Sequence, residues 1–381
     1  MEIEIGKLIK KAKLIRCGDG EYPVLSMTMH DGLMFQNDRF KKQIASVDQS
    51  QYQVVQRHQL VESFPIDEGV LAVQELTDAG IVSPAYKIWD VDMEKVVPKY
   101  LEFALRAPKS IEYYKFKLRG TTARRRSIPD AEFCAMRIKC PSLDEQKIIV
   151  DTIEKTKRVI DSRNLELDTL DDLIKARFVE MFGDPVNNEK GWITDTVDNL
   201  CIEIYGGGTP SKVHPEYYED GDIPWVSSKD MKTDILTDSQ IKINQMGVEN
   251  STARMVPVNS VIMVIRSGIL KHTLPVAINA VPITVNQDLK VFIPSERILT
   301  RFLAVQFKMH EKDILTGVRA VTADNIEFNS LKQRKLIVPS IELQQEYVLF
   351  LEQVDKSKLL VQKSLDETQM LFNSLMQKYF G

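Results

Sequence analysis

The stretch Pro141-Ser142-Leu143-Asp144-Glu145-Gln146 recurs later in the chain as Pro339-Ser340-Ile341-Glu342-Leu343-Gln344. The match continues without a gap to Met181-Phe182-Gly183, which aligns with Tyr379-Phe380-Gly381. Neither copy contains glycine or proline between its opening Pro-Ser and its closing Phe-Gly, which predicts one continuous helix in each. The serine suits an N-cap, and the glycine suits a helix stop. A helix of ~40 residues, at ~1.5 Å per residue, is ~60 Å long.

Both copies share one apolar stripe, whose positions alternate in steps of four and three residues. A narrow stripe of this kind is typical of a long helix that pairs with another long helix. The alternative is two ordinary amphipathic helices, each packed on its own domain, but the shared register favours pairing. The stripe consists of Ile149, Ile153, Thr156, Ile160, Arg163, Leu167, Leu170, Ile174, Arg177 and Met181 in the first copy, and of Tyr347, Leu351, Val354, Lys358, Val361, Leu365, Thr368, Phe372, Leu375 and Tyr379 in the second.

The segments ahead of the two helices are related more faintly. Each contains a strand-like apolar run, over residues 70–73 in the first and 261–265 in the second, followed by an expected helix and then a glycine. The chain therefore alternates domain, helix, domain, helix. The predicted boundaries are residues 1–140 for the first domain, 141–184 for the first long helix, 185–338 for the second domain and 339–381 for the second long helix.

Composition narrows the class of protein. Hydrophobic residues make up 43% of the chain, which is enough for buried cores, and the net charge of −4 argues against a bulk polycation. Charges interrupt the apolar residues of the amino terminus, and no stretch is apolar for long enough to span a membrane. We therefore expect neither a signal peptide nor a membrane protein. The four cysteines lie far apart and are expected to be reduced thiols in the cytoplasm.

Gly206-Gly207-Gly208-Thr209-Pro210-Ser211 is the strongest local signature outside the helices. It does not match a phosphate-binding loop, because no GxxxxGK[ST] pattern is present and Pro210 stands where a helix should begin. From the residues alone, the stretch is a glycine turn. A polar loop and a half-buried strand follow it, with Trp225 as the expected core anchor.

These motifs carry a resemblance to a known family. The glycine turn, followed by Gly221-Asp222-Ile223-Pro224-Trp225-Val226-Ser227, resembles the opening of a target-recognition domain in the specificity subunits of type I restriction-modification systems. Other segments resemble the family's junction, the start of its long helix and a recurring segment of its first domain. They are Phe182-Gly183-Asp184-Pro185, Lys190-Gly191-Trp192, Pro141 to Gln146, and Ala79 to Tyr86. The resemblance covers essentially the whole chain and is weakest over residues 1–70, which lack the glycine turn.

The resemblance implies an α+β protein in which two target-recognition domains alternate with two long helices that pair as an antiparallel coiled coil. It also implies that each domain reads one half of a bipartite, asymmetric duplex DNA target. The helices would hold the spacing and bind two methylation (M) subunits, and restriction (R) subunits would join the full complex of this host-defence system. S-adenosylmethionine, ATP and Mg²⁺ are then expected on the partner subunits, with no cofactor on this chain.

Two groups of residues are candidates for DNA contacts, because cationic, hydroxyl and amide side chains bind phosphates and base edges. The first group, in the first domain, is the basic run Lys115, Lys117, Arg119, Arg124, Arg125 and Arg126. The second group, in the second domain, comprises Lys212, Lys229, Arg266, Ser267, Lys271, His272, Arg319, Thr322 and Asn325. The alternative for each group is an ordinary solvated surface.

No catalytic motif stands out in the sequence. It contains no Asn-Pro-Pro-Phe or Asn-Pro-Pro-Tyr, no glycine-rich cofactor loop after a strand, no Walker A lysine and no convincing PD-(D/E)xK nuclease cluster. The five histidines show no ligand spacing for zinc, so we expect neither a metal site nor catalysis on this chain. The rival function is a coiled-coil scaffold or adaptor that binds proteins. An enzyme with an unrecognised site has little support.

Overall fold

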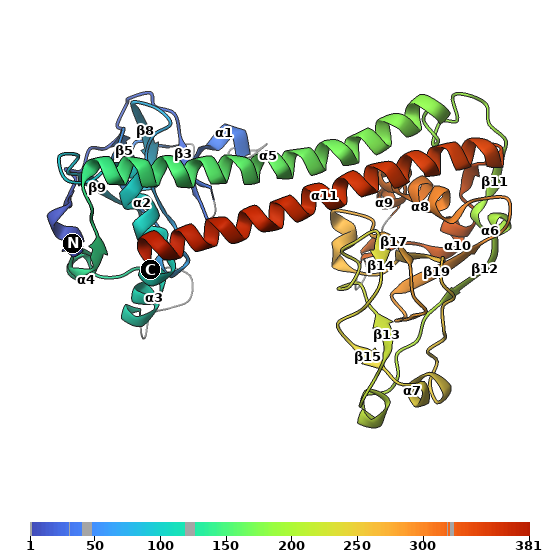
Figure 1. The fold of residues 1–381 in the computed structure, drawn as a ribbon. Coiled ribbons are helices and arrows are strands. Elements are labelled where there is room, and N and C mark those ends of the chain that lie inside the picture. Colours follow the sequence, from blue (N-terminus) through green and yellow to red (C-terminus); the bar gives the residue numbers. More distant parts are fainter. Residues whose placement is uncertain (1, 30, 40–47, 119–125, 318, 321–323) are drawn as a thin grey trace. The chain divides into compact units, whose positions relative to one another are not determined.

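Contacts divide the chain into two compact units. Unit 1 comprises Met1–Leu165 and Val361–Gly381, and unit 2 comprises Glu166–Leu360. The division falls within both long helices, so each unit holds one domain and part of each helix. These units differ from the four predicted segments, whose boundaries remain predictions. The computed structural model (Figure 1) describes residues 2–29, 31–39, 48–118, 126–317, 319–320 and 324–381.

The domain of unit 1 is built on an antiparallel sheet with the strand order β2-β9-β6-β7. Separate pairs are formed by β1 with β10, β3 with β4, and β5 with β8. The elements are β1 (Glu2–Glu4), the 3-10 turn η1 (Ile5–Lys7), β2 (Ile9–Lys11), β3 (Leu25–Thr28), β4 (Gly32–Phe35), α1 (Gln36–Arg39), β5 (Gln53–Gln56), β6 (Leu60–Glu62), η2 (Ile66–Glu68), β7 (Leu71–Val73), β8 (Ala79–Val82), β9 (Lys87–Val91), α2 (Pro98–Arg106), α3 (Pro108–Lys117), α4 (Asp130–Ala135) and β10 (Arg137–Lys139).

The domain of unit 2 has a sheet with the order β12-β19-β16-β17-β14 and a smaller sheet with the order β15-β13-β18. Pairs are also formed by β11 with β22 and by β20 with β21. The elements are β11 (Thr194–Thr196), α6 (Val197–Leu200), β12 (Cys201–Gly206), η3 (Pro215–Tyr217), β13 (Ile223–Val226), β14 (Ile235–Leu236), β15 (Lys242–Ile243), α7 (Gln245–Glu249), β16 (Val261–Val264), η4 (Gly268–Lys271), β17 (Val276–Asn279), β18 (Thr284–Val285), β19 (Leu289–Pro294), α8 (Thr300–Met309), α9 (Glu311–Thr316), β20 (Arg319–Ala320), β21 (Asp324–Asn325), α10 (Phe328–Lys332) and β22 (Lys335–Ile337).

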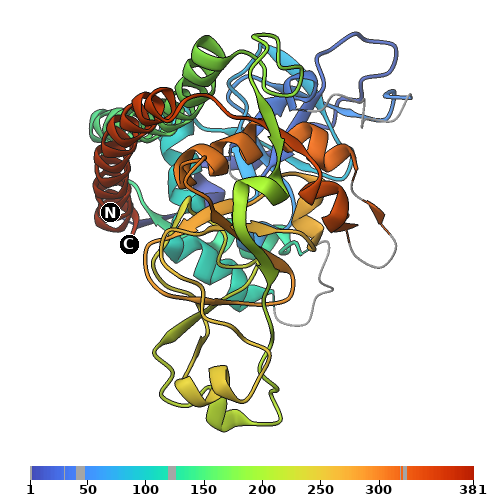
Figure 2. The ribbon, with the colours of Figure 1, turned by 90° about the vertical axis from the view of Figure 1, so that its right-hand side faces the viewer.

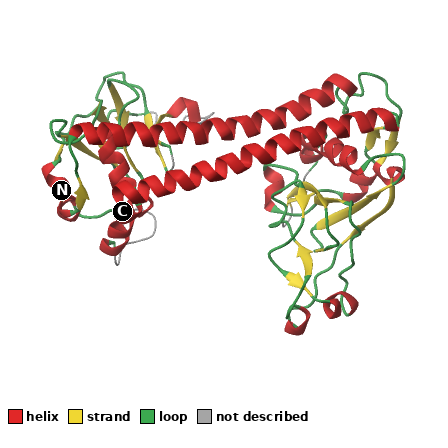
Figure 3. Ribbon diagram, in the orientation of Figure 1, coloured by secondary structure: helices red, strands yellow, loops and turns green. Residues whose placement is uncertain are grey.

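The two domains share one topology. The antiparallel order β2-β9-β6-β7 in unit 1 returns as β12-β19-β16-β17 in unit 2. In both units the first strand of the domain pairs with its last, with Glu2 opposite Lys139 and Thr194 opposite Ile337. Helices α2, α3 and α4 correspond in order to α8, α9 and α10. Figure 3 shows that both domains combine helices, in red, with strands, in yellow. The repeat seen in the sequence of the helices is therefore also a repeat of the domain fold.

The domains differ away from this shared sheet. In unit 2 a smaller lobe, coloured green and yellow, extends from the main sheet (Figure 2) and has its own core of Trp225, Ile243 and Ala253. In unit 1 the added pairs β3-β4 and β5-β8 contribute Leu25 and Val55 to a separate small core. The shared sheet thus carries different additions in the two domains.

The long helices α5 (Leu143–Phe182) and α11 (Ile341–Phe380) are each continuous over 40 residues, as predicted. In unit 1 the start of α5 packs with the end of α11, because Ile149 and Ile153 share a core with Met376 and Phe380. In unit 2 the end of α5 packs with the start of α11. Opposite ends meet in each unit, so the helices pair antiparallel, and the predicted coiled coil is confirmed.

Polar contacts in unit 2 hold the same arrangement. The hydroxyl of Tyr347 donates to the carbonyl of Ile174 at 3.0 Å. Lys358 forms an ion pair with Asp171 at 2.7 Å. Every residue of the predicted stripe is buried or half-buried, whereas leucines outside it, such as Leu359, are exposed. The predicted pairing face is therefore confirmed as well.

None of the described helices has the length and apolarity that a membrane span requires. The cysteines Cys17, Cys134, Cys140 and Cys201 are free thiols. Among the described residues, no three histidine, cysteine or carboxylate side chains come close enough together to hold a metal ion.

His310 is the most unusual buried titratable group of unit 2. It lies between α8 and α9 and is 2% exposed. Neither ring nitrogen has a hydrogen-bond partner among the described residues. Burial, reinforced by the positive charge of Arg334, lowers the pKa of His310 to about 4. The native protein thus holds this imidazole neutral well below its usual pKa.

We expect unit 2 to lose stability as the pH falls from about 6.5 to about 4. Over this window the unfolded chain binds a proton at His310 that the native chain does not, because the native pKa is the lower one. The loss reaches up to ~3 kcal/mol at pH 4, at ~1.4 kcal/mol per pKa unit. Urea unfolding followed at several pH values measures it. His310→Leu serves as the comparison and should show a smaller pH slope over this window; an unchanged slope would contradict the assignment.

Candidate nucleic-acid interface

In both domains, the loop that follows the second helix returns beside a 3-10 turn. In unit 1 the N–H of Ile66, in η2, donates to the carbonyl of Arg126 at 2.9 Å. In unit 2 the N–H of Ile326 donates to the carbonyl of Ile265 at 2.9 Å, and Arg266 forms a β-bridge with Asn325 beside η4. Arg126, the last residue of the basic run, and the β20–β21 hairpin therefore occupy corresponding positions in the two domains. We call this place the loop edge of each domain.

The basic run is anchored at both of its described ends. Lys117 forms an ion pair with Glu132 at 2.5 Å and lies over the Tyr113 ring, and the hydrogen-bonded ion pair raises the pKa of Lys117. Arg126 forms ion pairs with Asp67 at 2.9 Å and Glu68 at 2.5 Å. These pairs fix Lys117 at the end of α3 and Arg126 beside η2.

The remaining members of the basic run fall into two kinds. Lys115 is exposed, and none of the described residues forms an ion pair with it. Arg119, Arg124 and Arg125 lie outside the described residues. The loop edge of unit 1 thus presents Lys115, while Lys117 and Arg126 are already engaged with carboxylates.

Unit 2 brings most of its candidates together at its own loop edge. Ser267 caps η4 by accepting a hydrogen bond from the N–H of Ile269 at 3.5 Å, and Lys271 and His272 are exposed at the end of that turn. Asn325 is exposed, and the backbone of Arg319 pairs with it in the hairpin. Thr322 lies outside the described residues. Arg266 joins this edge through its bridge to Asn325.

The charge of Arg266 is partly compensated in this structure. Its Nε donates to Asp288 at 2.7 Å, and Asn286 donates to the same carboxylate at 3.3 Å. An exposed ion pair of this kind contributes little to stability, so exchange of the carboxylate for a phosphate is not costly. Amide and guanidinium groups at a loop edge are suited to phosphates and to base edges.

Lys212 and Lys229 stand apart from this group. Lys212 is exposed just after the glycine turn, and Lys229 is exposed just after β13. None of the described contacts joins Lys229 to the loop edge. Lys212 is linked more closely, because Thr209, three residues earlier in the chain, is hydrogen-bonded to Gln287.

Gln287 is a candidate that the sequence did not indicate. It is exposed next to Asp288, which pairs with Arg266. Its partner Thr209 approaches it only because the glycine turn folds back against β18. A lone glutamine carries no signal in a sequence, so only the fold could have identified it.

The glycine turn itself is a packing element. A Cβ on Gly207 would lie 1.8 Å from the carbonyl oxygen of Val285, and one on Gly208 would lie 2.3 Å from backbone atoms of Thr252. The N–H of Gly208 donates to Val285 at 3.0 Å, and the buried indole of Trp225 donates to the carbonyl of Gly208 at 3.0 Å. The turn therefore requires glycine for close approach, and Trp225 is the core anchor that the sequence predicts.

Comparison with known proteins finds similarity over part of the chain. The family model of the Type I restriction modification DNA specificity domain matches residues 189–368. The specificity subunit of the type I restriction enzyme EcoR124I/EcoR124II from Escherichia coli is 39% identical over 153 residues. That match covers 40% of this chain and only 38% of the relative's length. The predicted resemblance to specificity subunits is confirmed.

Two solved structures are similar over the whole chain. The S subunit of a type I restriction-modification system from M. genitalium gives a TM-score of 0.59 at 13% identity, covering 100% of this chain and 96% of that chain. A chain from work on complex assembly and conformational transition of the type I R-M system gives a TM-score of 0.58 at 15% identity, covering 100% and 97%. At this identity they show the fold alone, and the predicted α+β arrangement is confirmed.

Proposed function

We propose, from the membership of residues 189–368 in the type I restriction modification DNA specificity family, that this chain is the DNA-recognition subunit of a type I restriction-modification complex. Each domain reads one half of a bipartite duplex target. The observation that carries the proposal is the duplicated loop edge, which sits beside η2 in unit 1 and beside η4 in unit 2. Two domains that have the same sheet topology but different loop edges are suited to two different half-sites.

The DNA contacts in this proposal come from the loop edges. The basic run supplies phosphate contacts in the first domain. In the second domain the hairpin side of the edge, with Arg266 and Asn325, supplies both phosphate and base contacts. Lys212 and Lys229 contribute at the rim of the second half-site. In this proposal, all fifteen residues of the two candidate groups contact DNA.

The same proposal assigns the chemistry to other subunits. The helix pair binds two M subunits, and R subunits join the complex when it restricts DNA. S-adenosylmethionine, ATP and Mg²⁺ act on those partners, and this chain is not itself an enzyme. The complex works in the cytoplasm. Exposed leucines outside the pairing stripe, among them Leu173, Leu359 and Leu360, supply apolar surface on the helices for the M subunits.

Charge removal at the first loop edge should weaken DNA binding in a salt-dependent way. We expect a variant with Lys115, Arg119, Arg124 and Arg125 changed to alanine to bind its methylation target at least ~10-fold more weakly at ~0.15 M salt. Its slope of log affinity against log salt should be flatter by about one to three, because each lost phosphate contact removes ~0.9. Titration of the assembled complex with fluorescent duplex at several salt concentrations measures both.

A matched variant controls for the loss of charge. The control changes Lys7, Lys10, Lys13 and Lys139 to alanine, because these four exposed residues of the first domain lie outside both candidate groups and the change removes the same charge. This variant should keep the wild-type slope. If the wild-type complex showed no steep loss of affinity with salt, the chain would be a protein-binding scaffold, and the proposed function would be wrong.

A further inference from the structure

A fully buried glutamine joins the first long helix to the first domain. Gln146, in the first turn of α5, is 0% exposed. Its Oε1 accepts a hydrogen bond from the N–H of Val97 at 2.8 Å, directly before α2. Its Nε2 donates to the carbonyl oxygens of Lys95 at 3.2 Å and Pro141 at 2.9 Å. One amide thus binds the start of α5 to the start of α2.

The second domain repeats this joint. Gln344, in the first turn of α11, is also 0% exposed. Its Oε1 accepts from the N–H of Leu299 at 2.9 Å, directly before α8. Its Nε2 donates to the carbonyl oxygens of Arg297 at 3.1 Å and Pro339 at 2.9 Å. The two joints therefore share three bonds in the same order, and Gln146 makes a further contact from its Nε2 to the Sγ of Cys140 at 3.5 Å.

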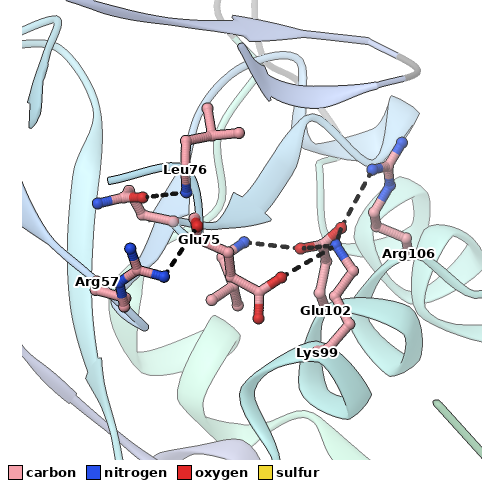
Figure 4. Close-up of polar contacts among 8 residues, drawn as sticks. Arg57, Glu75, Leu76, Lys99, Glu102 and Arg106 are labelled. Atoms are coloured by element: carbon pink, nitrogen blue, oxygen red, sulfur yellow. Dashed lines mark hydrogen bonds and ion pairs between the residues drawn. The ribbon is translucent and has the colours of Figure 1, made fainter. Parts of the chain in front are cut away.

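In unit 1, a side chain of α2 connects this helix to the sheet. Glu102 of α2 is buried and accepts a hydrogen bond from the N–H of Val73, at the end of β7, at 2.9 Å. Figure 4 shows the Glu102 carboxylate between Lys99 and Arg106, with ion-pair distances of 3.1 Å and 3.6 Å. Rigid contacts thus run from α5 through Gln146 to α2, and from α2 through Glu102 to the sheet.

In unit 2, α8 occupies the position that α2 has in unit 1. Gln306 of α8 is fully buried and forms two hydrogen bonds with the backbone of Ile337 in β22, at 2.8 Å and 3.1 Å. The hydroxyl of Thr300 donates to the carbonyl of Asn259 at 3.2 Å. Gln344 is therefore the amide link between α11 and a helix that is itself fixed within the domain.

A buried amide with three bonds does more than fill space. An apolar side chain of similar volume would also pack there, but hydrogen bonds have preferred directions, whereas apolar contacts do not. A different orientation of the helix would break these bonds and leave a backbone N–H and two carbonyls without partners in a buried place. Such an orientation is therefore disfavoured. Both joints thus fix an angle between helix and domain.

We propose that Gln146 and Gln344 are positioning residues that set the number of base pairs between the two half-sites. The proposal rests on the proposed function, in which each domain reads one half-site. A domain of about 140 residues has a radius of gyration of ~14 Å and thus a diameter of ~36 Å, so a tilt of ~5° at a joint on its surface moves the opposite edge by about the 3.4 Å rise of one base pair. Fixed joints are therefore needed for a fixed spacer.

The test uses the assembled complex with its methylation partners. Methylome sequencing of cells first gives the two half-sites and the spacer of the wild type. Duplexes with the native spacer, one base pair fewer and one more then compete for wild type, Gln146→Met and Gln344→Met. We expect each variant to reduce the preference for the native spacer at least ~5-fold while the half-site sequences stay the same. The competition ratio does not depend on the fraction of folded protein.

Gln53→Met is the matched control, because it removes a buried amide with two backbone bonds, to Ser83 and Tyr86, which lie in neither α2 nor the long helices. It should lower the melting temperature yet leave the spacer preference at the wild-type value. The proposal is wrong if the two joint variants keep the wild-type preference, or if Gln53→Met lowers it equally. Should Gln146→Met not assemble, Gln146→Glu, which keeps the acceptor for Val97, takes the same test. A complex without any bipartite motif would instead refute the proposed function.

Discussion

Replacing residues 185–338 with the corresponding segment of a relative should change one half of the methylated motif and leave the other half intact. The physical reason is that each domain has its own core and its own loop edge. Among the described contacts of the loop edges, Arg126 meets η2 within unit 1 and the hairpin meets η4 within unit 2. Methylome sequencing of cells that carry each chimera measures both halves at once.

The complementary exchange makes the test symmetrical. Replacing residues 1–140 should change the other half of the motif only. Because α5 and α11 are retained in both chimeras, the spacer should keep its length. Simultaneous changes of both halves in either chimera would mean that the two domains form one joint site, and the assignment of one half-site to each domain would then be wrong.

Leu351→Lys should destabilise the protein by at least ~3 kcal/mol. Leu351 belongs to the pairing stripe of α11, is 2% exposed and lies in the main core of unit 2, which also contains Phe178 of α5. Lysine there would bury an ammonium without a partner and lose the apolar contact. The midpoint of thermal unfolding, followed by circular dichroism, should fall by at least ~6 °C.

Leu359→Lys is the control on the same helix. Leu359 lies outside the stripe and is 71% exposed, so its replacement should change the free energy of unfolding by no more than ~0.5 kcal/mol. If both variants melted like the wild type, the stripe would not be the packed face. Loss of M-subunit binding by Leu359→Lys with unchanged stability would, in addition, support the proposed docking of partners on the outer face of the helices.

The helices could be predicted from the sequence because their signals are local. An uninterrupted run without glycine or proline and a stripe in steps of three and four are visible in one short window. The sheets could not be predicted in the same way. Several strands of unit 2, such as Ile235–Leu236 and Thr284–Val285, have two residues each. Their pairing depends on segments far along the chain, which a local pattern does not reveal.

The candidate site shows the same limit. The sequence pointed to Arg266 as a loop cation, but not to Asp288, which pairs with it from another loop. It showed the repeat that contains Gln146 and Gln344, yet only as the start of a helix. Their hydrogen-bond partners, such as Val97 and Leu299, lie some fifty residues earlier in the chain. A side chain whose role depends on distant backbone atoms cannot be read from its own neighbourhood.

The order of the two units along the chain has a consequence for biosynthesis. Unit 1 consists of Met1–Leu165 and Val361–Gly381, with the whole of unit 2 between them. Because a ribosome releases its product from the amino terminus, all residues of unit 2 emerge before the segment that completes unit 1. The domain that is made first therefore lacks two residues of its core, Met376 and Phe380, until the last turns of α11 have been made.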